Sequence, residues 1–208
     1  DNVGRDILAL IVYGIPTSLE IGLIAAGVGT GVGAILGSTV GYYGGWIDTV
    51  LRTMADITMA IPSLLILAII ASYVRATTIE TTAFILALFS WAGPTRSIRA
   101  QVLSMRERGF IPLSRLMGQG DLEILIKEIL PNILPYIAAG FVGSVTGAIM
   151  ASVGIQLLGL GPVHIPNLGM VLRFAFNGAA LYTGAWWWWG TPSAALFILF
   201  MGLFLVSL

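Results

Sequence analysis

The sequence predicts an all-α membrane protein, a polytopic bundle of transmembrane helices. Of its 208 residues, 57% are hydrophobic and only 10% are charged, and the mean hydropathy is +0.95. Average soluble domains carry about 25% charged residues, so this chain cannot cover a water-facing surface in the usual way. Crossing about 30 Å of hydrocarbon takes a helix of roughly 20 apolar residues. Five segments meet this requirement: residues 19–41, 55–74, 81–103, 133–160 and 187–208.

The first segment is rich in glycines at the spacing of one helical turn. Its overlapping Gly-x-x-x-Gly pairs involve Gly27, Gly29, Gly31, Gly33, Gly37 and Gly41. Within lipid, small residues at this spacing let the backbones of two helices approach closely. The pattern predicts that this helix packs tightly against another helix.

The second and third segments are less regular. Pro62 lies inside the second segment and predicts a kink, because it lacks a backbone donor and clashes with the preceding turn. The third segment is the weakest, since its uninterrupted apolar part is short before Arg96. The same helix can continue beyond the bilayer through Ile98, Val102 and Met105.

The distribution of basic residues predicts the orientation. Six of the ten basic residues lie in the 96–132 stretch, which follows the apolar part of the third segment: Arg96, Arg99, Arg106, Arg108, Arg115 and Lys127. This loop is therefore expected in the cytoplasm, with the 42–54 loop and its Arg52 on the same side. Arg5, Arg75 and Arg173 then lie outside, as does the 161–186 loop. The amino end is external, the carboxyl end is internal, and Trp186–Trp189 anchor the outer interface.

The cytoplasmic loop contains two predicted amphipathic helices. Pro112 suits the first position of a short helix whose apolar face is Leu113, Leu116 and Met117, and Gly118 and Gly120 end it. Asp121 is expected to cap the next helix. That helix places on one face Leu122, Leu125, Ile126, Ile129 and Leu130, and on the other the pair Glu123 and Lys127. From periodicity alone, the two helices either lie on the membrane surface or form a knob that fits a groove on a cytoplasmic partner.

No residue set predicts catalysis, so the chain is not expected to be an enzyme. The absence of cysteine removes disulfides and thiolate chemistry, and the single histidine, His164, has no neighbouring ligand cluster for a metal. Lys127 is the only lysine and follows no glycine-rich loop, so any ATP must be bound by another subunit. Balanced charge without a basic, aromatic cluster predicts no nucleic-acid partner.

The predicted spans carry no charge at their centres, where proton- or sodium-coupled carriers usually place one. This absence argues against an ion-coupled secondary carrier, which is the alternative function. A non-transporting scaffold is a more distant alternative. The polar residues near the centres are Thr30, Ser63, Ser144, Thr146 and Gln156, which suit hydrogen bonds between helices. Ser152 and Gln156 are predicted to face a translocation path.

Several short sequence motifs resemble those of one family and occur in the same order along the chain. Gly118, with Leu130-Pro131-Asn132 after it and Ile124 and Ile129 between, resembles the EAA loop of binding-protein-dependent ABC permeases. The likeness covers nearly the whole chain and indicates the dipeptide/oligopeptide branch. Its other strings are Asp1–Asp6 with Tyr13-Gly14 and Ser18-Leu19, Gly41–Trp46 with Asp48 and Asp56, Ala60–Leu65, Trp91 with Arg96 and Arg99, Arg106-Glu107 with Phe110, and Leu158–Gly161.

The chain also departs from the family pattern. Pro112-Leu113-Ser114 stands where Glu-Ala-Ala is usual, Glu128 where a histidine is common, and Ser152 where a glutamate is common. Arg52 falls one place before the usual arginine. These differences concern contacts with a partner more than the glycine-centred shape of the loop.

The resemblance implies a single permease domain over residues 1–208, of the type I ABC importer class, with a coupling loop at about 104–132. It implies five of six spans, the chain beginning after the family's first helix and external loop. The coupling residues it implies are Arg106, Glu107, Pro112, Leu113, Ser114, Arg115, Leu116, Met117, Gly118, Gln119 and Asp121.

The resemblance also implies partners and a location. The partners are a homologous permease, two cytoplasmic ATPases that hold ATP and magnesium, and an extracytoplasmic binding protein. The location is the prokaryotic cell (inner) membrane. Relatives of this kind carry peptides, oligosaccharides or chelated nickel, and the sequence does not separate these solutes.

Overall fold

The computed structural model describes residues 4–74 and 78–207. Asp1–Val3 and Arg75, on which part of the family resemblance and of the orientation depends, lie outside the described residues, as does Leu208. Within the described ranges the chain is helical and contains no strand. The all-α prediction is confirmed.

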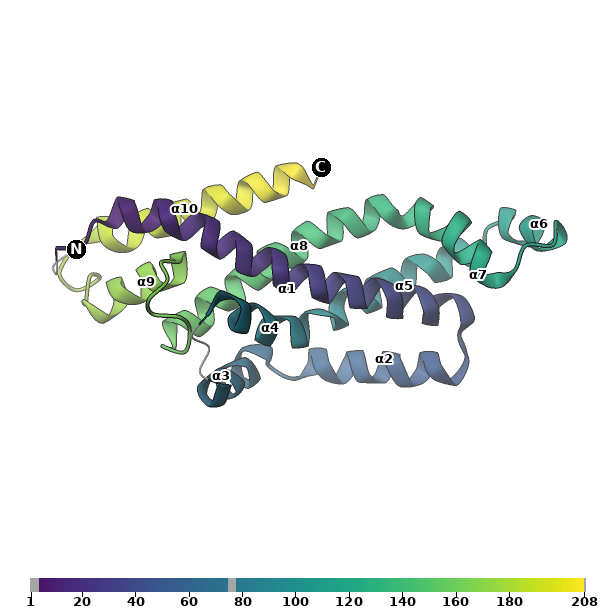
Figure 1. The fold of residues 1–208 in the computed structure, drawn as a ribbon, viewed down its shortest axis with the longest axis horizontal. Coiled ribbons are helices and arrows are strands. Elements are labelled where there is room, and N and C mark those ends of the chain that lie inside the picture. The colour runs from purple at the N-terminus through teal and green to yellow at the C-terminus, as the bar shows by residue number, and fades with distance from the viewer. Residues whose placement is uncertain (1–3, 75–77, 208) are drawn as a thin grey trace.

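Helix α1 (Ile7–Tyr43) runs along most of the molecule and contacts the other long helices (Figure 1). It begins at Asp6, whose Oδ1 accepts hydrogen bonds from the backbone amides of Leu8 (2.9 Å) and Ala9 (3.2 Å), which caps the helix. The helix therefore starts twelve residues before the predicted segment at 19–41. Its 37 residues correspond to a length of about 55 Å, more than one hydrocarbon thickness.

The glycine spacing in α1 is explained by two helices that lie against it, α4 (Ile79–Ser90) and α5 (Ala92–Arg106). A Cβ atom added at Gly37 would lie 2.6 Å from the carbonyl oxygen of Thr95, and one at Gly41 would lie 2.9 Å from Cβ of Val102. Gly29 and Gly33 make similarly close approaches to Ser90 and Pro94, whereas Gly27 and Gly31 face open space. Close packing is confirmed for one of the two glycine rows.

The second predicted span is two helices, α2 (Gly45–Ala60) and α3 (Ser63–Val74), which meet at an angle of 82°. The predicted kink at Pro62 is confirmed, and it is a complete break between two helices. Proline disfavours the helical conformation in the residue before it, and Ile61 is extended, with φ −83° and ψ 133°. Helix α2 consequently ends at Ala60 and the chain turns sharply before α3 begins.

The third predicted span is also divided, because α4 and α5 meet at Trp91. Helix α4 begins with a reciprocal capping arrangement between Thr78 and Thr81. Helix α5 continues to Arg106, as expected, and buries Ile98 and Val102 along its length.

The loop between α5 and the next long helix contains α6 (Phe110–Leu116), α7 (Asp121–Ile124) and a π-helical turn η1 (Leu125–Ile129), which leads into α8 (Leu130–Leu157). Helix α6 begins two residues before Pro112, so Pro112 is not its first residue. Proline is tolerated at this third position, because a backbone N–H there would have no acceptor within the helix.

The second amphipathic helix differs from its prediction in two ways. Gly120 occupies the cap position and Asp121 makes no capping hydrogen bond. The wider π turn shifts the buried face, so that Ile124, Leu125 and Ile129 are buried. Leu122 and Ile126 are exposed, at 61% and 52%, although the 3.6-residue period placed them with the buried set.

Two helices complete the chain, α9 (Leu168–Asn177) in the predicted external loop and α10 (Trp186–Val206) at the carboxyl end. Trp188 is buried against Gly178, while Trp186, Trp187 and Trp189 are exposed. An interfacial role therefore fits the three exposed tryptophans better than Trp188.

Among the described residues, three helices are long and apolar enough to cross a membrane: Ile7–Tyr43, Asp121–Leu157 and Trp186–Val206. The bent pair α2 and α3 makes a fourth if it crosses as one unit. Helices α4 and α9 are apolar but shorter. The five-span count and the orientation remain predictions.

We expect Gly37→Ala to lower the thermal unfolding temperature of the detergent-solubilised chain. The added methyl group meets the Thr95 carbonyl, and such overpacking costs about 1–3 kcal/mol. Gly31→Ala is the matched control, because the same change in the same helix faces open space. It should leave the unfolding temperature unchanged or raise it, since alanine favours helix over glycine by about 1 kcal/mol. Equal unfolding temperatures for the two variants would contradict close packing at Gly37.

Candidate functional site

Helix α6 projects from one end of the bundle (Figure 1) and presents an apolar surface. Leu113, Leu116 and Met117 are exposed at 56%, 85% and 66%, as the sequence predicted. The opposite side of the helix is buried through Ile111 and Ser114, and the Ser114 hydroxyl donates to the carbonyl of Phe110 at 3.1 Å. The three exposed residues, which we call the knob face, are therefore held on a helix that is anchored from behind.

The turn after α6 gives the knob a fixed shape. Gly118 has a φ of +85°, in the left-handed region that favours glycine. The Gln119 amide donates to the Ser114 carbonyl at 3.2 Å and the Gly118 amide donates to the Arg115 carbonyl at 3.0 Å. These two bonds form a Schellman motif, which satisfies the last carbonyls of the helix. The prediction that Gly118 ends the helix is confirmed.

Arg115 and Asp121 flank this turn and both contact Tyr42, near the end of α1. The Tyr42 hydroxyl donates to Oδ1 of Asp121 at 2.7 Å and accepts from Nη2 of Arg115 at 3.3 Å. The hydrogen bond with Tyr42 raises the pKa of the Arg115 guanidinium above its usual range.

Arg106 donates to the Tyr42 carbonyl at 2.9 Å and forms an exposed ion pair with Glu107 at 3.4 Å.

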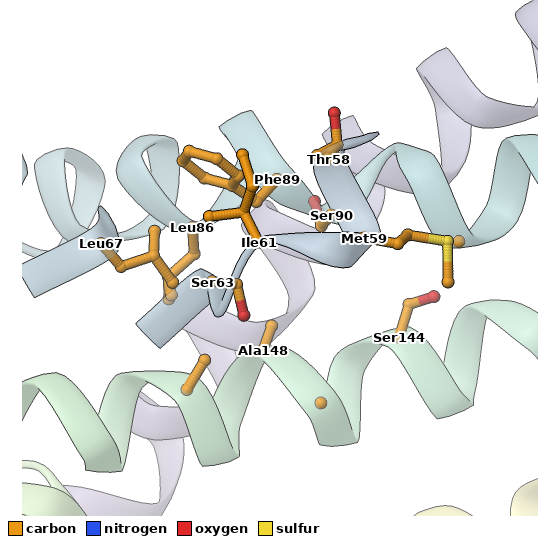
Figure 2. A pocket seen from close by; sticks show the side chains of 13 residues that line it. Thr58, Met59, Ile61, Ser63, Leu67, Leu86, Phe89, Ser90, Ser144 and Ala148 are labelled. Carbon is orange, nitrogen blue, oxygen red and sulfur yellow. The ribbon is translucent and has the colours of Figure 1, made fainter. Parts of the chain in front are cut away.

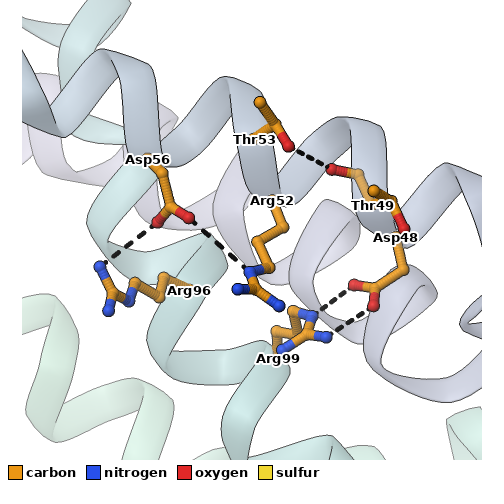
Figure 3. A network of polar contacts seen from close by, with 7 residues as sticks. All are labelled: Asp48, Thr49, Arg52, Thr53, Asp56, Arg96 and Arg99. Atoms are coloured by element: carbon orange, nitrogen blue, oxygen red, sulfur yellow. Dashed lines mark hydrogen bonds and ion pairs between the residues drawn. The ribbon is translucent and has the colours of Figure 1, made fainter.

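A second polar group connects α2 to α5 (Figure 3). Arg99 forms a bidentate pair with Asp48, in which Nη2 lies 2.6 Å from Oδ2 and Nε donates to Oδ1. Asp56 contacts Arg96 at 3.3 Å and Arg52 at 3.7 Å. The sequence analysis did not predict these pairs. Asp48, Arg52 and Asp56 recur every four residues, however, which places them on one face of a helix.

A cavity of about 360 Å³ opens at the break between α2 and α3, against α4 and α8 (Figure 2). Apolar side chains and hydroxyl groups line it, and none of its lining residues carries a charge. Ser63 and Ser144, which the sequence placed near span centres, both line this cavity. The full lining is Thr58, Met59, Ile61, Ser63, Leu67, Leu86, Phe89, Ser90, Gly93, Ser144, Gly147, Ala148 and Ala151.

Ser152 and Gln156, predicted to face a translocation path, lie elsewhere on α8. Both side chains are buried and neither lines the cavity. Gln156 donates from Nε2 to the Pro162 carbonyl at 2.9 Å and packs against Gly161 and Gly169, so it holds the turn between α8 and α9. The sequence could not show that these two side chains are buried, because polarity alone does not distinguish a residue that faces a pore from one that lies between helices.

His164 is exposed in the segment before α9. Among the residues that the structure describes, no group of three or more His, Cys, Asp or Glu side chains is arranged to hold a metal ion.

The family description "Binding-protein-dependent transport system inner membrane component" matches residues 29–208. The oligopeptide transport system permease protein OppC of Mycobacterium tuberculosis H37Rv is 30% identical over 198 residues, which cover 95% of this chain and 68% of that protein. OppC of Lactococcus lactis subsp. cremoris is also 30% identical, over 89% of this chain and 64% of that protein. A putative peptide permease of Brucella ovis is 32% identical, over 89% of this chain and 62% of that protein. The chain thus spans about two thirds of the length of these relatives.

The fold resembles that of the MetNI methionine ABC transporter in an inward-facing conformation. The TM-score is 0.71 at 21% identity, and the likeness covers 96% of this chain and 94% of that one. With the family match over most of the sequence, the chain belongs to the binding-protein-dependent transport system inner membrane components and is a permease subunit of an ABC transport system.

Proposed function

We propose that this chain pairs with a second permease in the cell membrane to form an alternating-access path for peptides. An extracytoplasmic binding protein delivers the solute, and two cytoplasmic ATPases supply the energy by binding and hydrolysing ATP with magnesium. Family membership and the names of the similar oligopeptide permeases support the class and the solute. They favour this function over an ion-coupled secondary carrier.

The observation that carries the coupling role is the knob face. An exposed apolar surface on a water-facing loop is stabilised by burial in a partner. Leu113, Leu116 and Met117 provide such a surface on a helix whose end is fixed by the Gly118 turn. This shape suits a helix that docks in a groove of the ATPase. Transport follows only if the groove contacts the knob differently in its open and closed states.

The cavity at the α2–α3 break is the part of this chain that we place on the solute path. Ligand sites commonly enclose about 300–1,000 Å³ and combine an apolar wall with a few polar groups, as this cavity does. Its hydroxyl groups can hydrogen-bond a peptide backbone, and its apolar wall can contact uncharged side chains. Because no lining residue is charged, electrostatic attraction does not hold the solute so strongly that it cannot leave.

The orientation is tested with single cysteines in this cysteine-free chain. Arg108 and His164 are both exposed, and the charge distribution places them on opposite sides of the membrane. We expect a membrane-impermeant maleimide to label His164→Cys in intact cells and Arg108→Cys only after permeabilisation. Labelling of Arg108→Cys in intact cells would overturn the proposed orientation.

We expect Leu116→Asp to abolish co-purification of the ATPase subunits. The change would bury an unpaired carboxylate in the docking groove, at a cost of about 3 kcal/mol or more. Val163→Asp is the control, because it also introduces a carboxylate at an exposed apolar residue but lies in the segment before α9. It should retain the ATPases. Normal recovery of the ATPases with Leu116→Asp would show that the knob face is not the docking surface.

Gly118→Ala should weaken ATPase binding, whereas Gly120→Ala should not. Neither added methyl group meets a neighbouring atom, so the two variants differ in backbone conformation. Gly118 is left-handed, which costs an alanine about 1–2 kcal/mol, and Gly120 has an ordinary φ of −75°. Titration of labelled ATPase into each variant in detergent measures the difference. Equal affinities would mean that the turn does not control the shape of the knob.

A further inference from the structure

Three elements meet at one buried side chain, that of Tyr42. This residue lies near the end of α1 and its side chain is 3% exposed. Arg115 comes from α6 and Asp121 begins α7, so the contacts of Tyr42 span 73 and 79 residues of sequence. The two elements on either side of the Gly118 turn are therefore tied to the same hydroxyl oxygen.

The hydroxyl group is used as both a donor and an acceptor. It donates to Asp121 Oδ1 at 2.7 Å and accepts from Arg115 Nη2 at 3.3 Å, and Arg115 Nη2 also lies 3.3 Å from Asp121 Oδ1. The three groups form a closed triangle. Arg115 and Asp121 are half exposed, so their ion pair alone is worth little in water. The buried tyrosine is what connects this pair to α1.

The rest of Tyr42 is also held. Its carbonyl accepts from Arg106 Nη1 at 2.9 Å, which joins the end of α5 to the end of α1. Its ring packs in an apolar cluster that includes Ile111 of α6 and Ile124 of α7. The Arg115 guanidinium carbon lies 5.9 Å from the ring centroid, within cation–π range. Movement of α6 and α7 therefore has to act on Tyr42.

Two covalent routes lead from the knob to the long helices. Residues 107–109 form a turn between α5 and α6, and on the other side α7 continues through the π turn η1 into α8, as one helix over Asp121–Leu157. Neither route leads directly to α1. The hydrogen-bonded triangle is thus a direct connection from the knob to α1, which is uninterrupted between Tyr42 and the glycines that contact α4 and α5.

We propose that Tyr42 is a positioning residue that transmits displacement of the knob to α1. This inference rests on the proposed function, since it takes the knob to be the docking surface. Without the hydroxyl group the knob face remains, so the ATPases still bind. Their movement then displaces α1 less than α6 and α7, because only the ring contacts with Ile111 and Ile124 remain, and ATP is hydrolysed with less transport.

The experiment uses the assembled importer in liposomes and compares Tyr42→Phe with Tyr43→Phe. Tyr43 is adjacent and 52% exposed, so its variant removes the same hydroxyl group outside the triangle. A bimane label on a cysteine at the exposed position Tyr13 of α1 reports the fluorescence change caused by ATP and vanadate. Uptake of radiolabelled trialanine per ATP hydrolysed is measured in the same preparations.

We expect Tyr42→Phe to keep normal ATPase co-purification and to lose most of the fluorescence change. Uptake per ATP should fall about tenfold, the factor expected for one lost hydrogen bond to a charged group. Tyr43→Phe should match the unmodified protein. Asp121→Ala, at a half-exposed position with little risk to folding, should behave as Tyr42→Phe does, and the double variant should be no worse than either single one.

Each outcome bears on one of the two proposals. Normal fluorescence change and uptake per ATP in Tyr42→Phe or Asp121→Ala, with the ATPases bound, overturn the role of Tyr42 and leave the docking role intact. Effects of Tyr42→Phe and Asp121→Ala that simply add also overturn it, because the two residues would then act separately. If Tyr42→Phe does not assemble, Asp121→Ala decides alone. Failure of the unmodified chain to bind the ATPases overturns both proposals.

Discussion

The close approach of α1 to α4 and α5 is the constraint on which the rest of the structure depends. Lipid offers helices no hydrophobic reason to associate, so their contact relies on dense packing of small residues. Gly37 and Gly41 bring the α1 backbone within reach of the backbone of α5 over successive turns. This contact aligns the ends of the two helices, and the polar groups at those ends can meet only because of it.

The polar groups gather at the end of the bundle that bears α6. Asp48 and Arg99 connect α2 to α5, and Tyr42 connects α1 to the elements around the Gly118 turn. These pairs add polar contacts to the packing between the helices. Around the cavity, whose lining carries no charged residue, hydroxyl groups and apolar side chains predominate. The molecule thus combines a firmly connected end with a cavity near the break in α2 and α3.

That break gives the cavity its position. Because Pro62 forces Ile61 into an extended conformation, α3 turns away from α2 by 82° and leaves space against α4 and α8. A continuous helix would fill this space with its own side chains. The same charged pairs that hold α2 to α5 also fix one side of the break.

The sequence by itself determined the helical class, the family, the apolar face of α6 and the glycine at its end, because these follow from composition, periodicity and local backbone preference. It located Pro62 but not the full break, since the size of a bend depends on what packs beside it. It identified Arg115 and Asp121 as coupling residues, but it predicted that Asp121 caps a helix. It also placed Ser152 and Gln156 on a path, whereas both are buried between helices. Only the tertiary structure brought Tyr42 to Asp121 across 79 residues, because contacts between distant segments arise from packing that no local pattern encodes.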